Sequence, residues 1–277
     1  MSIMSVTAVC RVATTTALLE FACGLMVANA EQGVTATNTL NFAGHVWKVK
    51  SSKKRVGPGS NYFSESKDNV WVDDAGRLHL RITQLEGKWH CAEVVSVECF
   101  GFGTYRFHVS TPLSKLDPNI TLGLFTWSDA PAYAHREIDI ECARWGKADD
   151  TNNAQFVVQP YQPPGRLLRY RVPENLEPVT YSFLWQSNSV LFRCLEGEAA
   201  APGTSNNVIQ EWNFTKSRIP LPGDENARMN LWLCTSRGPL DTNATEVVIS
   251  KFEFLPLHNK SIGEAHGQKP SVSGVTH

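Results

Sequence analysis

Residues 135–146 read "HREIDIECARWG". Glu137, Asp139 and Glu141 occupy every second position, with isoleucines between them. Because successive residues of a β-strand point to opposite faces, this spacing puts the three acids on one face and the isoleucines on the other. A helix would scatter the acids around its axis. The stretch therefore predicts a strand with one acidic and one apolar face.

Three carboxylates on one face repel each other unless some stay protonated or bind a ligand. Glycoside hydrolysis uses such groups, one to protonate the leaving oxygen and one to attack or to activate water, roughly 5–5.5 Å apart in retaining enzymes. The Cα atoms of Glu137 and Glu141 would lie about 13 Å apart on a strand, so both side chains must lean over Asp139. Asp139 could hydrogen-bond to one Glu and raise the proton affinity of the other.

The composition indicates one globular domain with a sizeable core. The chain has 277 residues, of which 42% are hydrophobic, 10% aromatic and 19% charged, and its formal net charge is -1. A near-neutral chain is a poor general partner for nucleic acid, which needs clustered positive charge. The basic run "KVKSSKKR" at 48–55 fits a solvated edge better than an anion-binding patch.

The two ends of the chain differ from its middle. Residues 1–30 resemble a signal peptide, with an apolar run that ends in Ala-Asn-Ala, although Glu20 interrupts the run. The uncharged halves on either side of Glu20 are too short to span a bilayer. We therefore expect a secreted or periplasmic protein without a membrane span in the mature chain, and a monomer. Residues 258–277 are polar and are expected to form a disordered tail.

Cysteine and histidine usage suggests neither a disulfide framework nor a metal site. Removal of the leader leaves five cysteines at irregular spacing, which favours small buried apolar residues, although a single bridge stays open. No spacing typical of metal ligands is present, so we expect no metal and no required cofactor. A structural calcium ion stays conceivable, but no acidic loop indicates one.

The middle of the chain reads as successive strands bounded by Gly, Pro or Asn. Residues 69–83 predict a hairpin, and 91–111 repeat that pattern around a glycine-aromatic turn. Residues 120–129 are nearly continuously apolar, as expected of a strand buried on both faces. No stretch has a convincing helical period. We therefore expect a single all-β domain over 41–257, a sandwich or barrel.

The acidic strand and its surroundings resemble glycoside hydrolase family 16. "EIDIE" is similar to that family's catalytic strand, and the ExDxE spacing resembles its lichenase and xyloglucan transglycosylase branch. Six further segments resemble lichenase-like segments in the same order, so the resemblance covers roughly residues 60–256. They are "NVWVDDAGRLHLRIT", "CAEVVS…GFGTYRFHV", "GLFTW", "TYSFLWQSNSV", "MNLW" and "ISKFEF".

The resemblance implies a jelly-roll sandwich of two curved antiparallel sheets with a concave substrate cleft. It also implies retaining, endo-acting hydrolysis of a β-linked polysaccharide. By position, Glu137 would be the nucleophile, Asp139 the helper and Glu141 the general acid/base. The order of the two glutamates comes from the resemblance alone.

The walls of the implied cleft depart from the lichenase pattern. Val95 stands where that pattern has Arg, and His135 where it has Trp. Cys91 matches half of a disulfide whose other half falls near Phe63, so that bridge should be absent. The expected substrate-binding residues are Glu93, Trp127, His135, Trp145, Gln159, Asn230 and Trp232, with Tyr161 a weaker candidate.

Other functions stay open at this point. A transglycosylase would use the same residues with a sugar hydroxyl in place of water. A non-catalytic carbohydrate-binding jelly roll, or a structural extracellular sandwich, would have no use for a repulsive row of acids. The sequence does not indicate which sugar or linkage is recognised.

Overall fold

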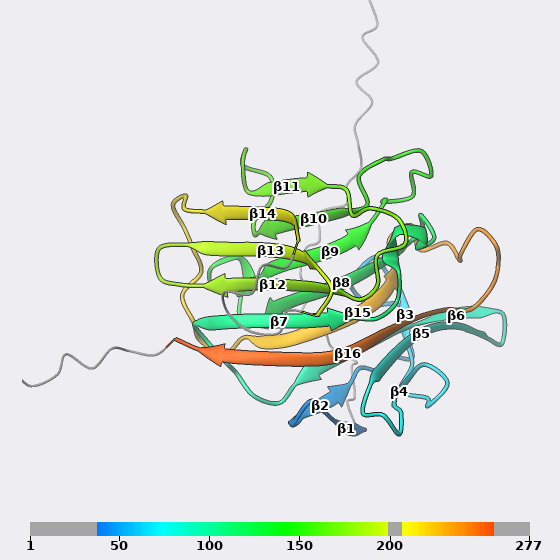
Figure 1. The fold of residues 1–277 in the computed structure, drawn as a ribbon. Helices are drawn as coiled ribbons and strands as arrows, with labels where there is room; N and C mark the ends of the chain where they lie inside the picture. The colour runs from blue at the N-terminus through cyan, green and yellow to red at the C-terminus, as the bar shows by residue number, and fades with distance from the viewer. Residues whose placement is uncertain (1–37, 199–206, 258–277) are drawn as a thin grey trace, which may run out of the picture.

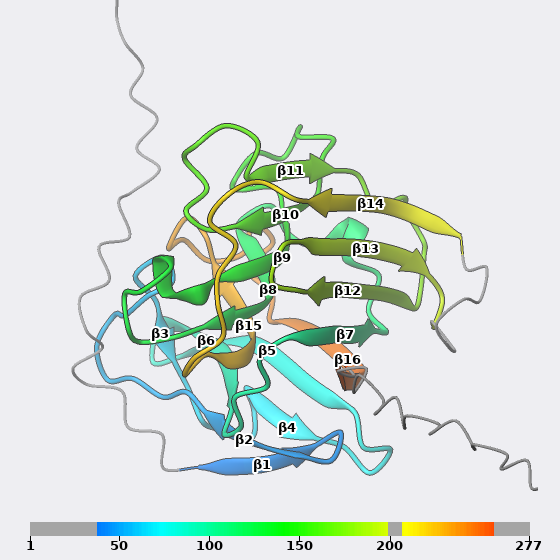
Figure 2. The same ribbon diagram turned by 90° about the vertical axis from the view of Figure 1, so that its left-hand side faces the viewer.

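The computed structural model describes residues 38–198 and 207–257, and in these ranges the chain forms two layers of β-strands (Figures 1 and 2). All strand pairs of these ranges but one are antiparallel; the exception is β3 (Tyr62–Phe63), which runs parallel to β6 (Lys88–Ser96). The prediction of an all-β jelly-roll sandwich is confirmed. The described helices are two short 3-10 turns, η1 (Leu113–Lys115) and η2 (Ala134–Arg136).

We call the layer that contains the acidic stretch the acid sheet and the other the outer sheet. In spatial order the acid sheet consists of β11 (Leu167–Tyr170), β10 (Ala154–Val158), β9 (Ile138–Ala143), β8 (Ile120–Trp127), β15 (Asn226–Leu233), β6 (Lys88–Ser96), β2 (His45–Val49) and β1 (Thr39–Phe42). The outer sheet consists of β14 (Val208–Phe214), β13 (Val190–Glu196), β12 (Val179–Trp185), β7 (Gly103–Val109), β16 (Thr245–Pro256), β5 (Leu78–Leu85) and β4 (Val70–Val72).

Two local predictions about strands are confirmed. β4 and β5 form the expected hairpin, with Gly76 at φ +75° in its turn, where a left-handed residue is needed. β8 is buried at every position from Ile120 to Thr126, as its continuous apolar pattern predicts.

The prediction of a second hairpin over 91–111 is wrong. β6 ends in the acid sheet, while β7 pairs with β12 and β16 in the outer sheet. The connection at 97–102 crosses between the layers because its aromatic residues pack into the core. Phe100 lies 5.7 Å from Phe252, and Phe102 lies 5.3 Å from Trp185, between ring centroids.

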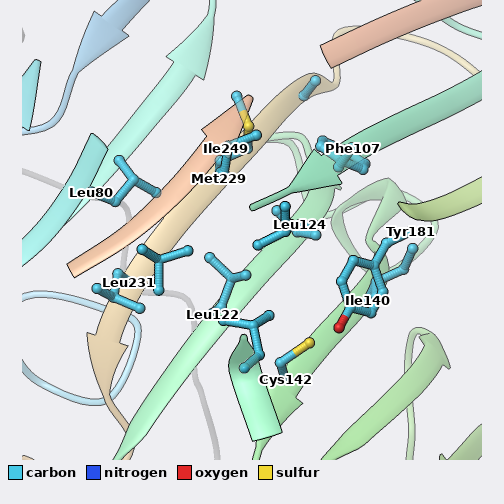
Figure 3. Packing of buried hydrophobic residues seen from close by; sticks show 14 of the residues in the cluster. Leu80, Phe107, Leu122, Leu124, Ile140, Cys142, Tyr181, Met229, Leu231 and Ile249 are labelled. Carbon is cyan, nitrogen blue, oxygen red and sulfur yellow. The ribbon is translucent and has the colours of Figure 1, made fainter. Parts of the chain in front are cut away.

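The core lies between the two layers (Figure 3). Ile140 and Cys142 project into it from β9 and face Tyr181 of the outer sheet, and all three side chains are buried. Slipping β9 by one residue would bury the acids and expose the isoleucines, so burial of this apolar face sets the register of the strand. The predicted division of β9 into an apolar and an acidic face is confirmed.

The five cysteines of the described ranges are free, and Cys91 lies opposite Phe63 in the β3–β6 pairing. The lichenase-type bridge is therefore absent, as expected from the phenylalanine. No helix in 38–198 or 207–257 is long and apolar enough to cross a membrane. The predicted signal peptide and the predicted C-terminal tail lie outside the described residues.

Candidate active site

The three predicted catalytic acids line one face of the β9 segment. Glu137 has extended backbone dihedrals just before the strand begins, and Asp139 and Glu141 follow within it. Glu137 and Glu141 are half-buried, whereas Asp139 is only 3% exposed. We call these three residues the acid row.

Glu141 is held from the neighbouring strand β10. Gln155 lies directly opposite it, and the Gln155 Nε2 donates a 2.7 Å hydrogen bond to Glu141 Oε2. The Gln155 Oε1 in turn accepts hydrogen bonds from Arg169 Nη1, at 3.0 Å, and from Trp145 Nε1, at 3.2 Å. Trp145, predicted to bind substrate, is thus tied to the acid row through Gln155.

Asp139 is bonded on both sides. Gln159 Nε2 donates a hydrogen bond to Asp139 Oδ2 at 3.1 Å, so this predicted substrate-binding residue lies beside the acid row. A second hydrogen bond joins Asp139 to Glu137; it raises the pKa of Asp139 and lowers that of Glu137. These opposite effects describe a hydrogen bond in which the Asp139 carboxyl is the donor and a Glu137 oxygen is the acceptor.

The backbone at Glu137 is anchored to both flanking strands. Thr126 Oγ1 donates to the Arg136 carbonyl at 2.8 Å and accepts from the Ile138 N–H at 3.3 Å. The Gln159 N–H donates to the Glu137 carbonyl at 3.1 Å. Thr126 is completely buried, so it fixes the position of Glu137 from inside the sheet.

A left-handed turn leads into Glu137. The four residues Tyr133 to Arg136 have φ between 51° and 61°, and none of them is glycine. Each such residue costs roughly 1–2 kcal/mol relative to the right-handed region. The Arg136 side chain holds the turn: its Nε donates to the Leu221 carbonyl at 3.0 Å, and its guanidinium lies against Gly223, where a Cβ would approach within 2.5 Å.

Relief of this strain should stabilise the protein. Ala134→Gly is expected to raise the free energy of unfolding by about 0.5–1 kcal/mol, because glycine adopts φ +51° without steric cost. The melting temperature should rise by about 1–4 °C. Ala130→Gly is the control, because Ala130 has no positive φ and should only be destabilised. Equal losses of stability in both variants would contradict a strained turn.

His135 and Trp127 stack on each other beside Glu137. Their ring centroids are 4.2 Å apart and their planes are within 4°. His135 Nδ1 donates to the Ser128 carbonyl at 2.9 Å, and the Arg228 guanidinium lies 5.9 Å from the Trp127 ring centroid. Because protein groups already flank the Trp127 ring, sugar stacking on it stays a prediction.

The remaining predicted binding residues are on the same face of the sheet but are covered. Glu93 is 1% exposed and accepts bonds from Lys50 Nζ at 3.3 Å and Asn230 Nδ2 at 3.3 Å. Trp232 is 4% exposed and packs beneath Gly59, where a Cβ would lie 2.6 Å from its ring. Direct sugar contact at these residues would require the Gly57–Gly59 segment to move, so it stays a prediction.

Burial raises the pKa of every member of the acid row. It is the largest cause at each carboxyl, and the pKa of Glu137 rises to about 8, with the charge of Glu141 adding to the effect. The pKa of Glu141 rises to about 7, against the lowering effects of Gln155 and Arg169. The pKa of Asp139 lies well above its ordinary value because both glutamates add to its burial. The row therefore retains protons near neutral pH.

A consequence for stability follows from the raised pKa of Glu137. In the unfolded chain Glu137 ionises near pH 4.5, whereas in the folded protein it stays protonated until about pH 8. The contribution of Glu137 to the free energy of unfolding is therefore fully present below pH 4.5 and is lost as the pH rises to 8. Glu137→Gln should therefore gain at least about 1 kcal/mol, or about 2–4 °C in melting temperature, at pH 8 and almost nothing at pH 4. The control is the exposed Glu174→Gln; a pH-independent gain would contradict the prediction.

Sequence reasoning missed four residues around the acid row: Thr126, Gln155, Arg169 and Arg228. Gln155 is the one polar residue of β10, which is a usable signal, whereas Arg228 shares β15 with two asparagines. Arg228 also lies directly opposite Val95, the position where the lichenase-like pattern has arginine. These four residues lie outside the stretch of sequence that carries the acid row, so the sequence alone does not show that they lie around it.

Nothing in the described ranges points to a metal site: no group of three or more His, Cys, Asp or Glu side chains there could hold an ion. Two surface hollows are present, one of about 420 Å³ between β1 and β4 and one of about 270 Å³ beside β3. Neither includes a member of the acid row. The predicted substrate cleft over the row stays a prediction.

No protein-family model matches the chain, and no curated protein matches its sequence. The fold itself is shared with solved β-glucanases. A Bacillus licheniformis β-glucanase is 20% identical with a TM-score of 0.57, over 82% of this chain and 100% of the other. A β-1,3-1,4-glucanase (lichenase) from a mouse hindgut metagenome is 20% identical with a TM-score of 0.56, over 78% and 96%.

A third structure with this fold is described as a pseudo β-1,3-glucanase of Mycobacterium tuberculosis. It is 16% identical with a TM-score of 0.54, over 76% of this chain and 91% of the other. The chain thus has the fold of the glycoside hydrolase structures that its sequence resembles. At these identities the likeness establishes the fold, and activity must be argued from the acid row.

Proposed function

We propose that the protein is a retaining glycoside hydrolase that cleaves a β-linked polysaccharide internally by double displacement. The observation that carries this proposal is the acid row itself: Glu137, Asp139 and Glu141 share one face of one strand and retain protons near neutral pH. Such a row weakens the fold at neutral pH, and a proton donor beside a carboxylate is what glycoside hydrolysis requires.

The reactive form has Glu137 ionised and Glu141 protonated; this order comes from the resemblance and not from the pKa values, of which that of Glu137 is the higher. In the first step, the Glu137 carboxylate attacks the anomeric carbon while the glycosidic C–O bond breaks. Glu141 gives its proton to the departing oxygen. In the second step, Glu141 takes a proton from water, the water oxygen bonds to the anomeric carbon, and Glu137 is released. Asp139 keeps Glu137 in place by donating a hydrogen bond to it. The reaction needs no cofactor.

Two alternatives use the same face of the sheet. In a transglycosylase, a sugar hydroxyl takes the place of water in the second step. In a binding module, glycans would bind without being cut; the neighbour described as a pseudo-glucanase favours keeping this candidate. We further propose that the protein is exported, on the ground of the signal-like residues 1–30, and that it acts as a monomer.

A panel of β-glucans and β-galactans, assayed for new reducing ends and for binding, tests the proposal. We expect the wild type to cut at least one polysaccharide and Glu137→Gln to bind it without cutting. New ends that accompany a rapid fall in viscosity would support internal cleavage. Equal binding by both proteins with no cutting of any glycan would overturn the hydrolase and favour the binding module.

A further inference from the structure

Arg228 is a buried cation on the acid side of the sheet that the proposed reaction does not yet use. It lies on β15, opposite Phe125 of β8, and Phe125 lies opposite Asp139. These cross-strand pairings place Arg228 level with the middle of the acid row, two strands away. Its side chain is only 8% exposed.

The guanidinium extends along β8 toward Glu137. The Arg228 Nη2 lies 3.3 Å from Asp129 Oδ1, and the guanidinium carbon Cζ lies 5.9 Å from the Trp127 ring centroid. Trp127 is level with Glu137, because the next pair along the two strands joins Thr126 to Ile138. The charged end of Arg228 is thus displaced toward the Glu137 end of the row.

The two carboxylates near Arg228 only partly neutralise its positive charge. Nη1 lies 3.4 Å from Glu93 Oε1, but Glu93 is also paired with Lys50, at 3.3 Å. Asp129 is 82% exposed, so water screens its interaction with the guanidinium. Within the described residues, the buried Arg228 Nε has no hydrogen-bond partner. A buried and incompletely satisfied arginine is costly, which calls for a functional reason.

We propose that Arg228 is a positioning residue for the proposed reaction, whose guanidinium holds Glu137 ready as the attacking carboxylate. The inference rests on the proposed function and adds a residue to it. Glu141 has its own support from Gln155 and Arg169 on the opposite side of the row. Cationic support from two different strands would let the two glutamates take different roles.

The groups around Glu137 set the sign of the effect. Asp139 and Glu141 lie on the same strand segment as Glu137, and His135 lies in the turn just before it. From the neighbouring elements come Trp127 of β8, Asp129 of the turn after β8, Gln159 after the end of β10, and Arg228 of β15. Burial and Glu141 raise the pKa of Glu137, while the Arg228 charge lowers it. Loss of the positive charge should therefore raise the pKa of Glu137 further.

The test is a ¹³C-carboxyl NMR titration of Glu137, assigned with Glu137→Gln, in the wild type, Arg228→Met and Arg228→Lys. We expect Arg228→Met to raise the pKa of Glu137 by about one unit and Arg228→Lys to leave it nearly unchanged. The control is Arg193→Met, because Arg193 pairs with Glu211 on the outer sheet. If Arg228→Met does not fold, Arg228→Gln replaces it.

The pH dependence of kcat/KM completes the test. The acidic limb of this profile reports protonation of the nucleophile, and its apparent pKa should rise by the same amount in Arg228→Met. At pH values below that pKa, kcat/KM should therefore fall about tenfold. An unchanged Glu137 titration, or a loss of activity that is equal at all pH values, would overturn the role of Arg228. The titration needs no substrate, so a failure to cut any glycan would count against the proposed function alone.

Discussion

Replacement of Glu137 by alanine is expected to lower kcat/KM for polysaccharide cleavage by at least about 10⁴-fold, the scale of loss seen when a covalent nucleophile is removed. No other carboxylate can take its place. Asp139 is shorter, buried and hydrogen-bonded to Gln159, and Glu141 is bonded to Gln155. Initial rates of reducing-end release measure the loss.

Added azide should restore part of the activity of Glu137→Ala. The small anion can occupy the space left by the carboxylate and attack the anomeric carbon from the same side, so the product should be a glycosyl azide of inverted configuration. Glu174→Ala, an exposed acid far along the chain, serves as the control and should keep wild-type rates. Wild-type activity in Glu137→Ala would contradict the assignment.

Replacement of Glu141 by alanine is expected to lower kcat/KM on polysaccharide by roughly 10²–10⁴-fold, the contribution of a positioned general acid/base. The loss should shrink on aryl glycosides with a good leaving group, because departure of such a group needs no proton. Paired measurements on polysaccharide and on an aryl glycoside of the same sugar give this difference directly.

Azide should act differently on Glu141→Ala than on Glu137→Ala. Here the covalent glycosyl-enzyme still forms, and azide intercepts it without help from a base, so the glycosyl azide should retain the configuration of the substrate. The two variants thus give products of opposite configuration. Equal loss in Glu141→Ala on both substrate types, with no azide product, would contradict its role as acid/base; reversed configurations would exchange the two glutamates.

The acidic strand could be predicted from the sequence because the alternation of faces is a local property. Ile138 and Ile140 are buried and the acids share the other face, and a single register satisfies both. The hairpin of β4 and β5 was predictable for the same reason, since its turn and both strands are adjacent in the chain.

The pairings that complete the site are not local. β6 and β7 look like a hairpin, but the aromatic side chains of their connection pack between the layers and send β7 to the outer sheet. Gln155 and Arg228 reach the acid row only through the register of β10 and β15. No single stretch of sequence contains that register.

Two features of the site run against local propensity. The residues Tyr133 to Arg136 have no glycine to indicate a left-handed turn, so the turn is imposed by contacts with distant residues such as Leu221. Trp232 follows the cleft-like "MNLW" pattern, yet Gly59 allows a loop to lie directly on its ring. In both cases tertiary contacts decide the outcome.

A covalent intermediate on Glu137 can be tested by proton NMR of a polysaccharide digestion in its first minutes, before the released sugar ends mutarotate. Double displacement at Glu137 predicts that the β-anomer appears first and that the α-anomer grows in later at the rate of mutarotation. Initial release of the α-anomer would mean direct attack by water and would contradict a covalent intermediate on Glu137.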